Sequence, residues 1–259
     1  MSRPWKSELR IRLGRRGCEL QLCAAWSRRV IAQAGAAGTP AEALPVALAA
    51  LREQAGPALS GEARLRVPDE LVYLSLRPAA TTWPAARQEA IAHFGAALGR
   101  QDLVVQVVAL PGGSGWLAAA IEPGDLRAWQ GALADAGIRL AHVELALLDD
   151  LRQLAAQVAD EAVVALLRDE GLTLLRIASG VPVGLVWERC DPRTLRLAEQ
   201  RVSAFQSAMA GDTATPVWLR CRTRAECAQW QSLAHEHGWT LLPPGDAAAA
   251  ATAAPEARA

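Results

Sequence analysis

The order of apolar runs in residues 161–243 constrains the fold of this chain most strongly. Three apolar runs, EAVVALL, LTLLRI and VPVGLVWE, are separated by the short segments RDEG and ASG. Because acidic-glycine and serine-glycine pairs mark turns between strands, this pattern predicts a meander of three strands. The remainder predicts a helix over 192–209, a strand over 216–221, a helix over 223–238 and a strand over 239–243. The predicted order of elements is therefore β-β-β-α-β-α-β.

This order resembles the ribonuclease-H-like unit, which is also the half-domain of actin-like ATPases. Both kinds of protein need acidic residues at fixed positions on their strands. A two-metal nuclease of the first kind needs carboxylates on the first and fourth strands of the unit. The corresponding runs, 163–167 and 216–221, contain none. The sequence therefore carries the signal of the fold without the signal of nuclease chemistry.

Composition excludes several other classes of protein. The 259 residues have a formal net charge of +0, which gives no long-range attraction to nucleic acid. No apolar run approaches the roughly 18 residues of a transmembrane helix, and the first residues lack the apolar core of a secretory signal. Lys6 is the only lysine, and it follows Trp5 rather than the glycine of a GxxxxGK[ST] loop. We therefore expect a cytoplasmic protein without a phosphate-binding loop of that kind.

Residues suited to metal or nucleophilic chemistry form no recognisable motif. His235 and His237 lie two apart on a predicted helix, so they face different sides. The glycine-rich segment 111–115 joins two predicted strands, whereas a phosphate-binding loop leads into a helix. The cysteines include no CxxC pair, which predicts reduced thiols at Cys18, Cys23, Cys190, Cys221 and Cys227. We expect no metal site.

The first half of the chain also alternates strands and helices. A hairpin is predicted around Gly14–Gly17, and a second hairpin over 102–121 is flanked by predicted helices. The residues 245–259 are mostly alanine without an apolar pattern, which predicts a disordered tail. The predicted fold is α/β with two lobes of mixed sheets flanked by helices. The first lobe covers 1–153 and contains an inserted helix-hairpin-helix subdomain at about 79–141. The second lobe covers 154–244.

Residues 71–152 narrow the comparison to one family. They contain a strand that ends in Arg77-Pro78, a helix rich in alanine, the hairpin DLVVQVVALPGGSGWLAAAIE and the segment AGIRLAHVELALLDDL. This arrangement resembles the actin-like PilM family and the cytoplasmic domain of the type II secretion L protein. The resemblance covers most of residues 8–243, and it implies two actin-like lobes that are both built on the ribonuclease-H-like pattern.

The resemblance also implies where a nucleotide would bind, because in that family the first strand-turn-strand of each lobe carries a phosphate-binding motif. In the first lobe, Gly14 follows Arg12-Leu13, so an arginine stands where the family has an acid. In the second lobe, Asp169 and Gly171 keep the acid and the glycine, with Glu170 between them. Since Mg²⁺ and its waters need carboxylates, we expect Gly14, Asp169 and Gly171 to be remnants of a nucleotide site, with no cofactor and no enzymatic activity.

The function implied by the resemblance is that of a scaffold in the assembly platform of a type IV-like pilus or a type II-like secretion machine. Such a scaffold would dock a short cytoplasmic segment of a membrane-anchored partner, and it would lie at the inner membrane through that partner. Val107 and Trp116 of the hairpin are the residues expected at the docking surface, and Trp83 and Trp129 flank it. The alternatives are a working actin-like ATPase or kinase and a binding module unrelated to pili.

Overall fold

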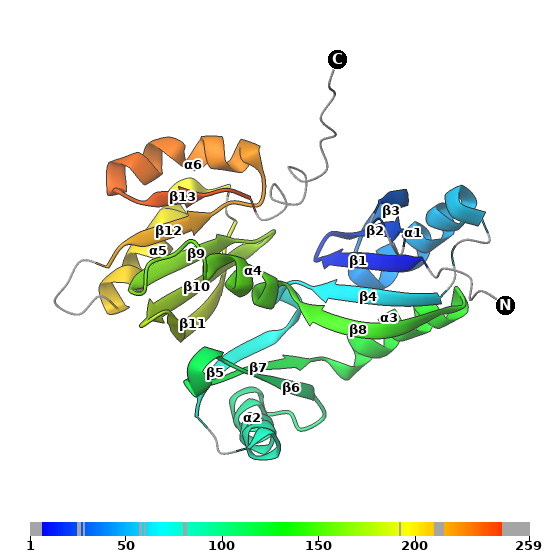
Figure 1. Ribbon diagram of the computed structural model, residues 1–259, viewed down its shortest axis with the longest axis horizontal. Helices are drawn as coiled ribbons and strands as arrows, with labels where there is room; N and C mark the ends of the chain where they lie inside the picture. Colours follow the sequence, from blue (N-terminus) through cyan, green and yellow to red (C-terminus); the bar gives the residue numbers. More distant parts are fainter. Residues whose placement is uncertain are drawn as a thin grey trace. The chain divides into compact units, whose positions relative to one another are not determined.

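A computed structural model describes residues 7–24, 27, 29–56, 59, 61–79, 82–191, 193–209 and 215–244 of the chain (Figure 1). In this part of the chain the strands form two five-stranded sheets and one three-stranded sheet. Helices pack against the sheets, so the predicted α/β class with two mixed sheets is confirmed. The predicted tail, 245–259, lies outside the described residues.

The first sheet has the strand order β3-β2-β1-β4-β8. Strand β1 pairs antiparallel with β2 and parallel with β4, which makes the sheet mixed. Along β1, Leu9, Ile11 and Leu13 are buried, and the residues between them are polar and partly exposed, as expected for a strand with one covered face. The strands are β1 (Glu8–Gly14), β2 (Gly17–Cys23), β3 (Val30–Ala37), β4 (Gly61–Val67) and β8 (Ile138–Leu145).

Two helices, α1 (Pro40–Ala55) and α3 (Pro123–Asp135), cover the apolar face of this sheet. The backbone N–H of Thr39 donates to Glu42 Oε2 over 3.1 Å, which satisfies an N–H group just ahead of α1. The core between the sheet and the two helices includes Trp129, whose side chain is 1% exposed. Trp129 is therefore a core residue and does not line a groove beside the hairpin.

Strand β3 was not predicted from the sequence. Its residues, VIAQAGAA, are mostly alanine and glycine, which have low β-propensity and give no alternating pattern. Pairing with β2 holds the strand in place, and Ala32, Ala34 and Ala36 pack against the core of the first sheet. Tertiary contacts rather than local preference explain this element.

The three-stranded sheet has the order β5-β7-β6, and its strands lie within residues 73–121. A short 3₁₀ turn, η2 (Asp69–Leu71), leads into it, and a second one, η3 (Pro111–Gly113), closes the hairpin between β6 and β7. The other elements of this segment are β5 (Tyr73–Pro78), α2 (Trp83–Leu98), β6 (Val104–Ala109) and β7 (Gly115–Ile121).

The second five-stranded sheet has the order β11-β10-β9-β12-β13, and its elements follow one another as β-β-β-α-β-α-β. Strands β9, β10 and β11 form the antiparallel meander, while β12 and β13 run parallel to β9. Every residue of β9 is buried, as in a central strand that is covered on both faces. The elements are β9 (Ala162–Leu167), β10 (Gly171–Ala178), β11 (Val181–Arg189), α5 (Leu195–Met209), β12 (Val217–Arg220), α6 (Arg224–His237) and β13 (Thr240–Leu242), preceded by α4 (Ala146–Leu154).

Backbone contacts divide the chain into two compact units. The first contains Met1–Tyr73, Arg87–Gln106 and Ala119–Leu148, and the second contains Leu74–Ala86, Val107–Ala118 and Asp149–Ala259. Most of α4 thus belongs to the second unit. The predicted limits of the two lobes, and those of the insert at about 79–141, stay predictions. No helix within the described residues is both long enough and apolar enough to cross a membrane.

Candidate functional site

The first of the two predicted phosphate-binding turns joins β1 to β2 in the first unit. Gly14 ends β1 and lies opposite Gly17, the first residue of β2. A side chain at Gly17 would come within 2.5 Å of the carbonyl oxygen of Ala36, so the neighbouring strand β3 requires a glycine there. Arg12 lies opposite Glu19 on β2 and beside Arg66 on β4. The strand position at which the resemblance implies an acid is therefore occupied by an arginine, with Glu19 and Arg66 on the neighbouring strands.

The second predicted turn joins β9 to β10 in the second unit, and its acidic side chains are held by arginines. Asp169 forms an ion pair with Arg222, which follows β12. Glu170 pairs with Arg189 of β11 over 3.2 Å, and the carboxylate of Glu170 is largely buried. Both carboxylates that could hold a metal-bound water at this turn are therefore already engaged by positive charges of the same unit.

Gly171, the third predicted remnant, has a packing role in the structure. A side chain at this position would overlap the carbonyl oxygen of Glu188 and would lie 3.1 Å from the ring of Trp187. Strand β11 approaches so closely here that only glycine fits. The glycine of the turn is thus explained by the pairing of β10 with β11, without any ligand.

A buried group of charges lies beside this second turn. Asp150 of α4 forms ion pairs with Arg168 over 2.8 Å and with Arg220 over 3.3 Å, and all three side chains are at most 12% exposed. Arg220 also bonds to Gln153, one turn further along α4, and Arg168 donates to the hydroxyl of Thr173 over 3.3 Å. These contacts fix α4 against the ends of β9 and β12, on the face of the sheet opposite α5 and α6.

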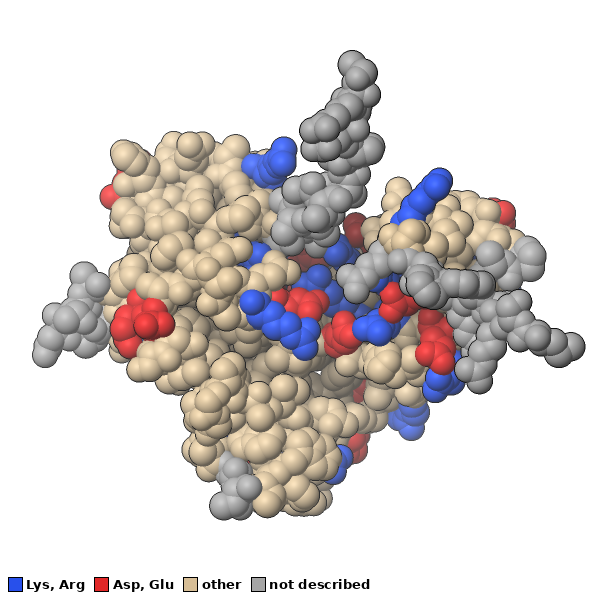
Figure 2. Space-filling model, viewed as in Figure 1, with Lys and Arg blue, Asp and Glu red and all other residues tan. Residues whose placement is uncertain are grey.

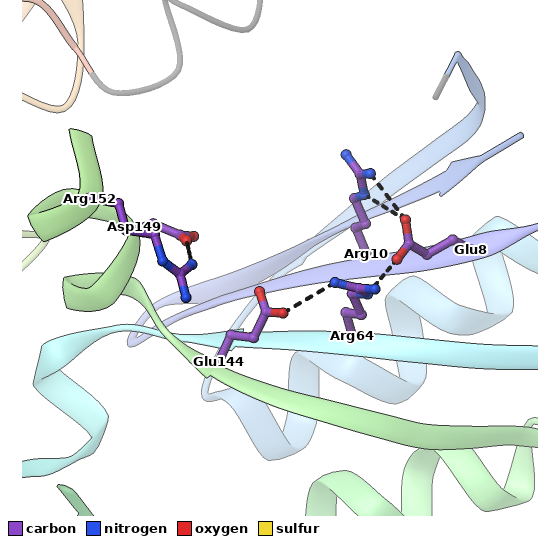
Figure 3. Close-up of polar contacts among 6 residues, drawn as sticks. All are labelled: Glu8, Arg10, Arg64, Glu144, Asp149 and Arg152. Atoms are coloured by element: carbon purple, nitrogen blue, oxygen red, sulfur yellow. Dashed lines mark hydrogen bonds and ion pairs between the residues drawn. The ribbon is translucent and has the colours of Figure 1, made fainter. Parts of the chain in front are cut away.

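In the first unit, the polar face of the sheet carries a row of alternating charges. Figure 2 shows acidic and basic side chains gathered over this unit, and Figure 3 shows the residues that connect three strands. Glu8 of β1 lies 3.0 Å from Arg10 and 2.5 Å from Arg64 of β4, and Arg64 lies 3.4 Å from Glu144 of β8. Because each carboxylate is paired, this face has no acidic group left over for a metal among these residues.

Figure 3 also shows Asp149 and Arg152 on α4 of the second unit. These two side chains pair over 3.0 Å, and the guanidinium of Arg152 is 73% exposed. Asp149 and Asp150 are adjacent in the sequence, yet one carboxylate is in an exposed pair and the other is in a buried cluster. The contrast follows from the helix, which turns neighbouring residues to different sides.

The two residues expected at the docking surface, Val107 and Trp116, lie on neighbouring strands of the insert. The side chain of Val107 is 5% exposed, whereas that of Val108 on the same strand is 41% exposed. Trp116 is half-buried next to Gly115. A partner that approached β6 would therefore meet Val108 before Val107.

Helix α2 covers part of strand β6, which is an edge strand of the three-stranded sheet. The indole Nε1 of Trp83 donates to the carbonyl of Val107 over 3.3 Å, and Nε of Arg87 donates to the carbonyl of Val105 over 3.1 Å. These bonds occupy two acceptors that an added strand would otherwise use. The ring of Trp83 itself stays 48% exposed beside β6.

Thiols and metal ligands do not combine into a site in the described part of the chain. No three His, Cys, Asp or Glu residues there are arranged to hold a metal ion. Burial raises the pKa of the Cys221 thiol, and the neighbouring Cys227 raises it further. Burial also raises the pKa of Cys18, Cys23 and Cys190. These four groups stay protonated near neutral pH, which makes them poor nucleophiles and poor metal ligands.

Sequence reasoning missed the cluster around Asp150. Three of its members are separated by many residues in the chain, and only the fold brings α4, β9 and β12 together. The signal in the sequence was weak: Arg220 interrupts an apolar strand, and a charged residue in a strand that pairs on both sides needs a buried partner. Nothing in the sequence identified that partner as Asp150 rather than Asp149.

Comparison with known proteins gives similarity in structure alone. No family model matches the chain, and no curated protein matches it. A structure described as the PilM–PilN type IV pilus biogenesis complex matches with a TM-score of 0.71 at 12% identity, over 93% of this chain and 88% of that one. The cytoplasmic domain of EpsL, an inner membrane component of the type II secretion system of Vibrio cholerae, matches with a TM-score of 0.51 at 13% identity, over 82% and 81%.

A third match is a Bacteroides thetaiotaomicron protein of unknown function with an actin-like ATPase fold. Its TM-score is 0.63 at 9% identity, over 92% of this chain and 90% of that one. Identities this low establish a common fold and nothing finer. Together with the two mixed sheets and the β-β-β-α-β-α-β order of the second one, these matches show that the chain has the actin-like ATPase fold.

Proposed function

We propose that this protein is a non-catalytic scaffold in the assembly platform of a type IV-like pilus or a type II-like secretion machine. It docks a short cytoplasmic segment of a membrane-anchored partner, and this contact holds it at the inner membrane. The similarity to a structure described as a PilM–PilN complex and to the cytoplasmic domain of EpsL supports this class of function.

The observation that carries the non-catalytic part of the proposal is the pairing of the acidic residues at the second turn. A working nucleotide site needs a carboxylate that is able to hold Mg²⁺ or a water next to the phosphates. Asp169 is paired with Arg222, and Glu170 is paired with Arg189. A metal ion at either carboxylate would have to compete with a guanidinium that already neutralises it.

The first turn supports the same conclusion by a different route. Arg12 places a positive charge on β1 at the position that the family gives to an acid, and Arg66 lies beside it on β4. An arginine at this position supplies no oxygen ligand for Mg²⁺. The sheet therefore keeps the actin-like geometry while the charges at both turns differ from those that Mg-ATP needs.

Thermal unfolding with Mg-ATP tests this proposal. A ligand that binds only the native state stabilises it by RT ln(1 + [L]/Kd), so at about 1 mM a site weaker than about 10 mM adds less than roughly 0.1 kcal/mol. We expect Mg-ATP to raise the melting temperature by less than about 1 °C. A larger, dose-dependent rise that is lost in Asp169→Ala would show that Mg-ATP binds at the second turn and would favour a working actin-like ATPase or kinase instead.

The docking part of the proposal needs a separate test. Synthetic peptides that cover the cytoplasmic segments of membrane proteins encoded beside this gene are titrated against the labelled protein, with fluorescence anisotropy as the readout. We expect one segment to bind and its scrambled version to fail. If every segment fails, or if the neighbouring genes encode no membrane-anchored platform protein, the scaffold role is wrong and a binding module unrelated to pili is the better explanation.

A further inference from the structure

Arg77, on strand β5, is an arginine to which the described residues give no acidic partner. It lies one residue before the end of β5, it is half-buried, and its Nε is fully buried without a hydrogen-bond acceptor in that part of the chain. A buried N–H without an acceptor costs on the order of 1–3 kcal/mol, and the cost is larger for a charged group. The structure thus contains a cation whose bonding is incomplete.

Several other arginines of the second unit show how this protein commonly treats such groups. Each forms an ion pair with a carboxylate, and the pairs are Arg168 with Asp150, Arg176 with Glu161, Arg189 with Glu170, Arg201 with Glu188 and Arg222 with Asp169. Arg189 and Arg201 are at least half exposed, so solvent could have served them. Arg77 differs from these arginines, because its Nε is buried and no carboxylate among the described residues pairs with it.

The backbone around Arg77 is held firmly. A side chain at Gly115, the first residue of β7, would come within 2.5 Å of the carbonyl oxygen of Arg77, so β5 and β7 are in close contact at this point. Trp116 follows Gly115 and is half-buried. Arg77 therefore belongs to a strand packed closely against β7, which carries one of the residues expected at the docking surface.

We propose that Arg77 binds an acidic side chain of the docked partner segment. A guanidinium offers N–H donors in a planar fork that matches the two oxygens of a carboxylate, so an aspartate or a glutamate that approaches the two Nη groups supplies the missing counter-charge. Charge complementarity determines the chemistry of the occupant: it is a peptide segment with a carboxylate at one fixed position. This inference rests on the proposed docking function and names the residue that selects the partner.

Selection from random peptides tests the proposal whatever the sequence of the partner. A phage-displayed library of short random peptides is panned on the intact chain, and the recovered peptide is synthesised in its original form and with its acidic residue changed to the amide. We expect the recovered peptides to share an aspartate or a glutamate at one position. Each form is then titrated by calorimetry against the wild type, Arg77→Gln, Arg77→Lys and Arg193→Gln.

Arg193 is an exposed arginine of the same unit and serves as the matched control, because its substitution changes the net charge equally. Arg77→Gln should weaken binding of the acidic peptide by about ten- to a hundredfold, which is typical of a charged hydrogen bond, and Arg193→Gln by less than about threefold. The amide peptide should bind the wild type as weakly as the acidic peptide binds Arg77→Gln. The amide peptide should also bind Arg77→Gln almost as well as it binds the wild type, because the interaction is already lost. Arg77→Lys should retain part of the affinity and its dependence on salt.

The outcomes separate this inference from the docking function on which it rests. The role of Arg77 is overturned if the recovered peptides share no acidic residue. It is also overturned if the losses of binding free energy from Arg77→Gln and from the amide peptide simply add. Either result leaves the docking function intact. If inorganic phosphate displaces the acidic peptide at equal concentration, Arg77 belongs to a general anion site, and its proposed role in selecting the partner is also overturned. If the wild type recovers no peptide, both the docking function and the inference fail. If circular dichroism shows that Arg77→Gln does not fold, two other measurements test the role of Arg77. These are the affinity of the amide peptide for the wild type and the affinity of the acidic peptide for Arg77→Lys.

Discussion

Asp150 of α4 and Arg168, the residue after β9, form a buried ion pair over 2.8 Å, and this contact fixes α4 on the second sheet. Arg220 of β12 shares the same carboxylate. Removing two guanidiniums and a carboxylate from water is unfavourable unless they bond to one another, so the three residues depend on each other. The cluster therefore fixes one arrangement of helix and strands, while its net contribution to stability is smaller than the number of contacts suggests.

Replacing Asp150 by asparagine is expected to be strongly destabilising. The amide keeps the size of the side chain but leaves Arg168 and Arg220 buried without a counter-charge, which should cost about 3–5 kcal/mol in the free energy of unfolding. The neighbouring variant Asp149→Asn is the matched control, because its partner Arg152 is largely exposed, and it should cost less than about 1 kcal/mol. Urea denaturation measures both, and equal losses would contradict the structural role of the cluster.

Gly171 offers a second matched pair. Gly171→Ala places a methyl group against the carbonyl of Glu188 and the ring of Trp187, so we expect a loss of about 1–3 kcal/mol from overpacking. Gly131→Ala, within α3, meets nothing within 4 Å and removes a flexible residue from a helix, so it should stabilise the chain by about 0.5–1 kcal/mol. A tolerated Gly171→Ala would contradict the packing role of this glycine.

The only tyrosine of the chain, Tyr73, should titrate above its ordinary range. Burial raises the pKa of Tyr73, and Glu122, which accepts its hydroxyl over 3.2 Å, raises it further. A raised pKa in the folded state means that this group stabilises the fold below the unfolded pKa of about 10, and that the contribution is lost as pH rises through the folded value. Absorbance at the tyrosinate band should show a midpoint above that of the chain in guanidinium, and Glu122→Gln should bring the midpoint down without abolishing the difference. An unchanged midpoint in Glu122→Gln would show that the hydrogen bond does not persist in solution.

The sequence was sufficient for the fold because the second lobe has a clear pattern. Its apolar runs are long, their turns are marked by glycine, and Gly238 ends α6 in the left-handed conformation that a glycine cap favours. Strand β3 carries alanines and glycines instead, and it is formed by pairing with β2, which no local pattern reveals. Fold information is therefore local in one lobe and partly non-local in the other.

The candidate site was harder to predict for a physical reason. The sequence identifies Asp169 and Gly171 by their order in a turn, but it cannot show that Arg222 reaches Asp169 or that Glu188 packs against Gly171. Both relations depend on strand order and register, which follow from the whole sheet. The same limit explains why the sequence did not single out Arg77. Only the structure shows which residues surround it, and that none of the described ones is an acidic partner.

Strand β6 provides the last prediction, because its adjacent valines have opposite environments. Val107 is 5% exposed, so Val107→Asp buries a carboxylate without a partner and should cost more than about 3 kcal/mol, or prevent folding altogether. Val108 is 41% exposed, so Val108→Asp should change stability by less than about 0.5 kcal/mol. Circular dichroism with urea denaturation separates the two variants. A partner segment that docks on this strand should then lose affinity for the well-folded Val108→Asp variant. Full binding by that variant would show that the partner does not dock on the exposed face of β6.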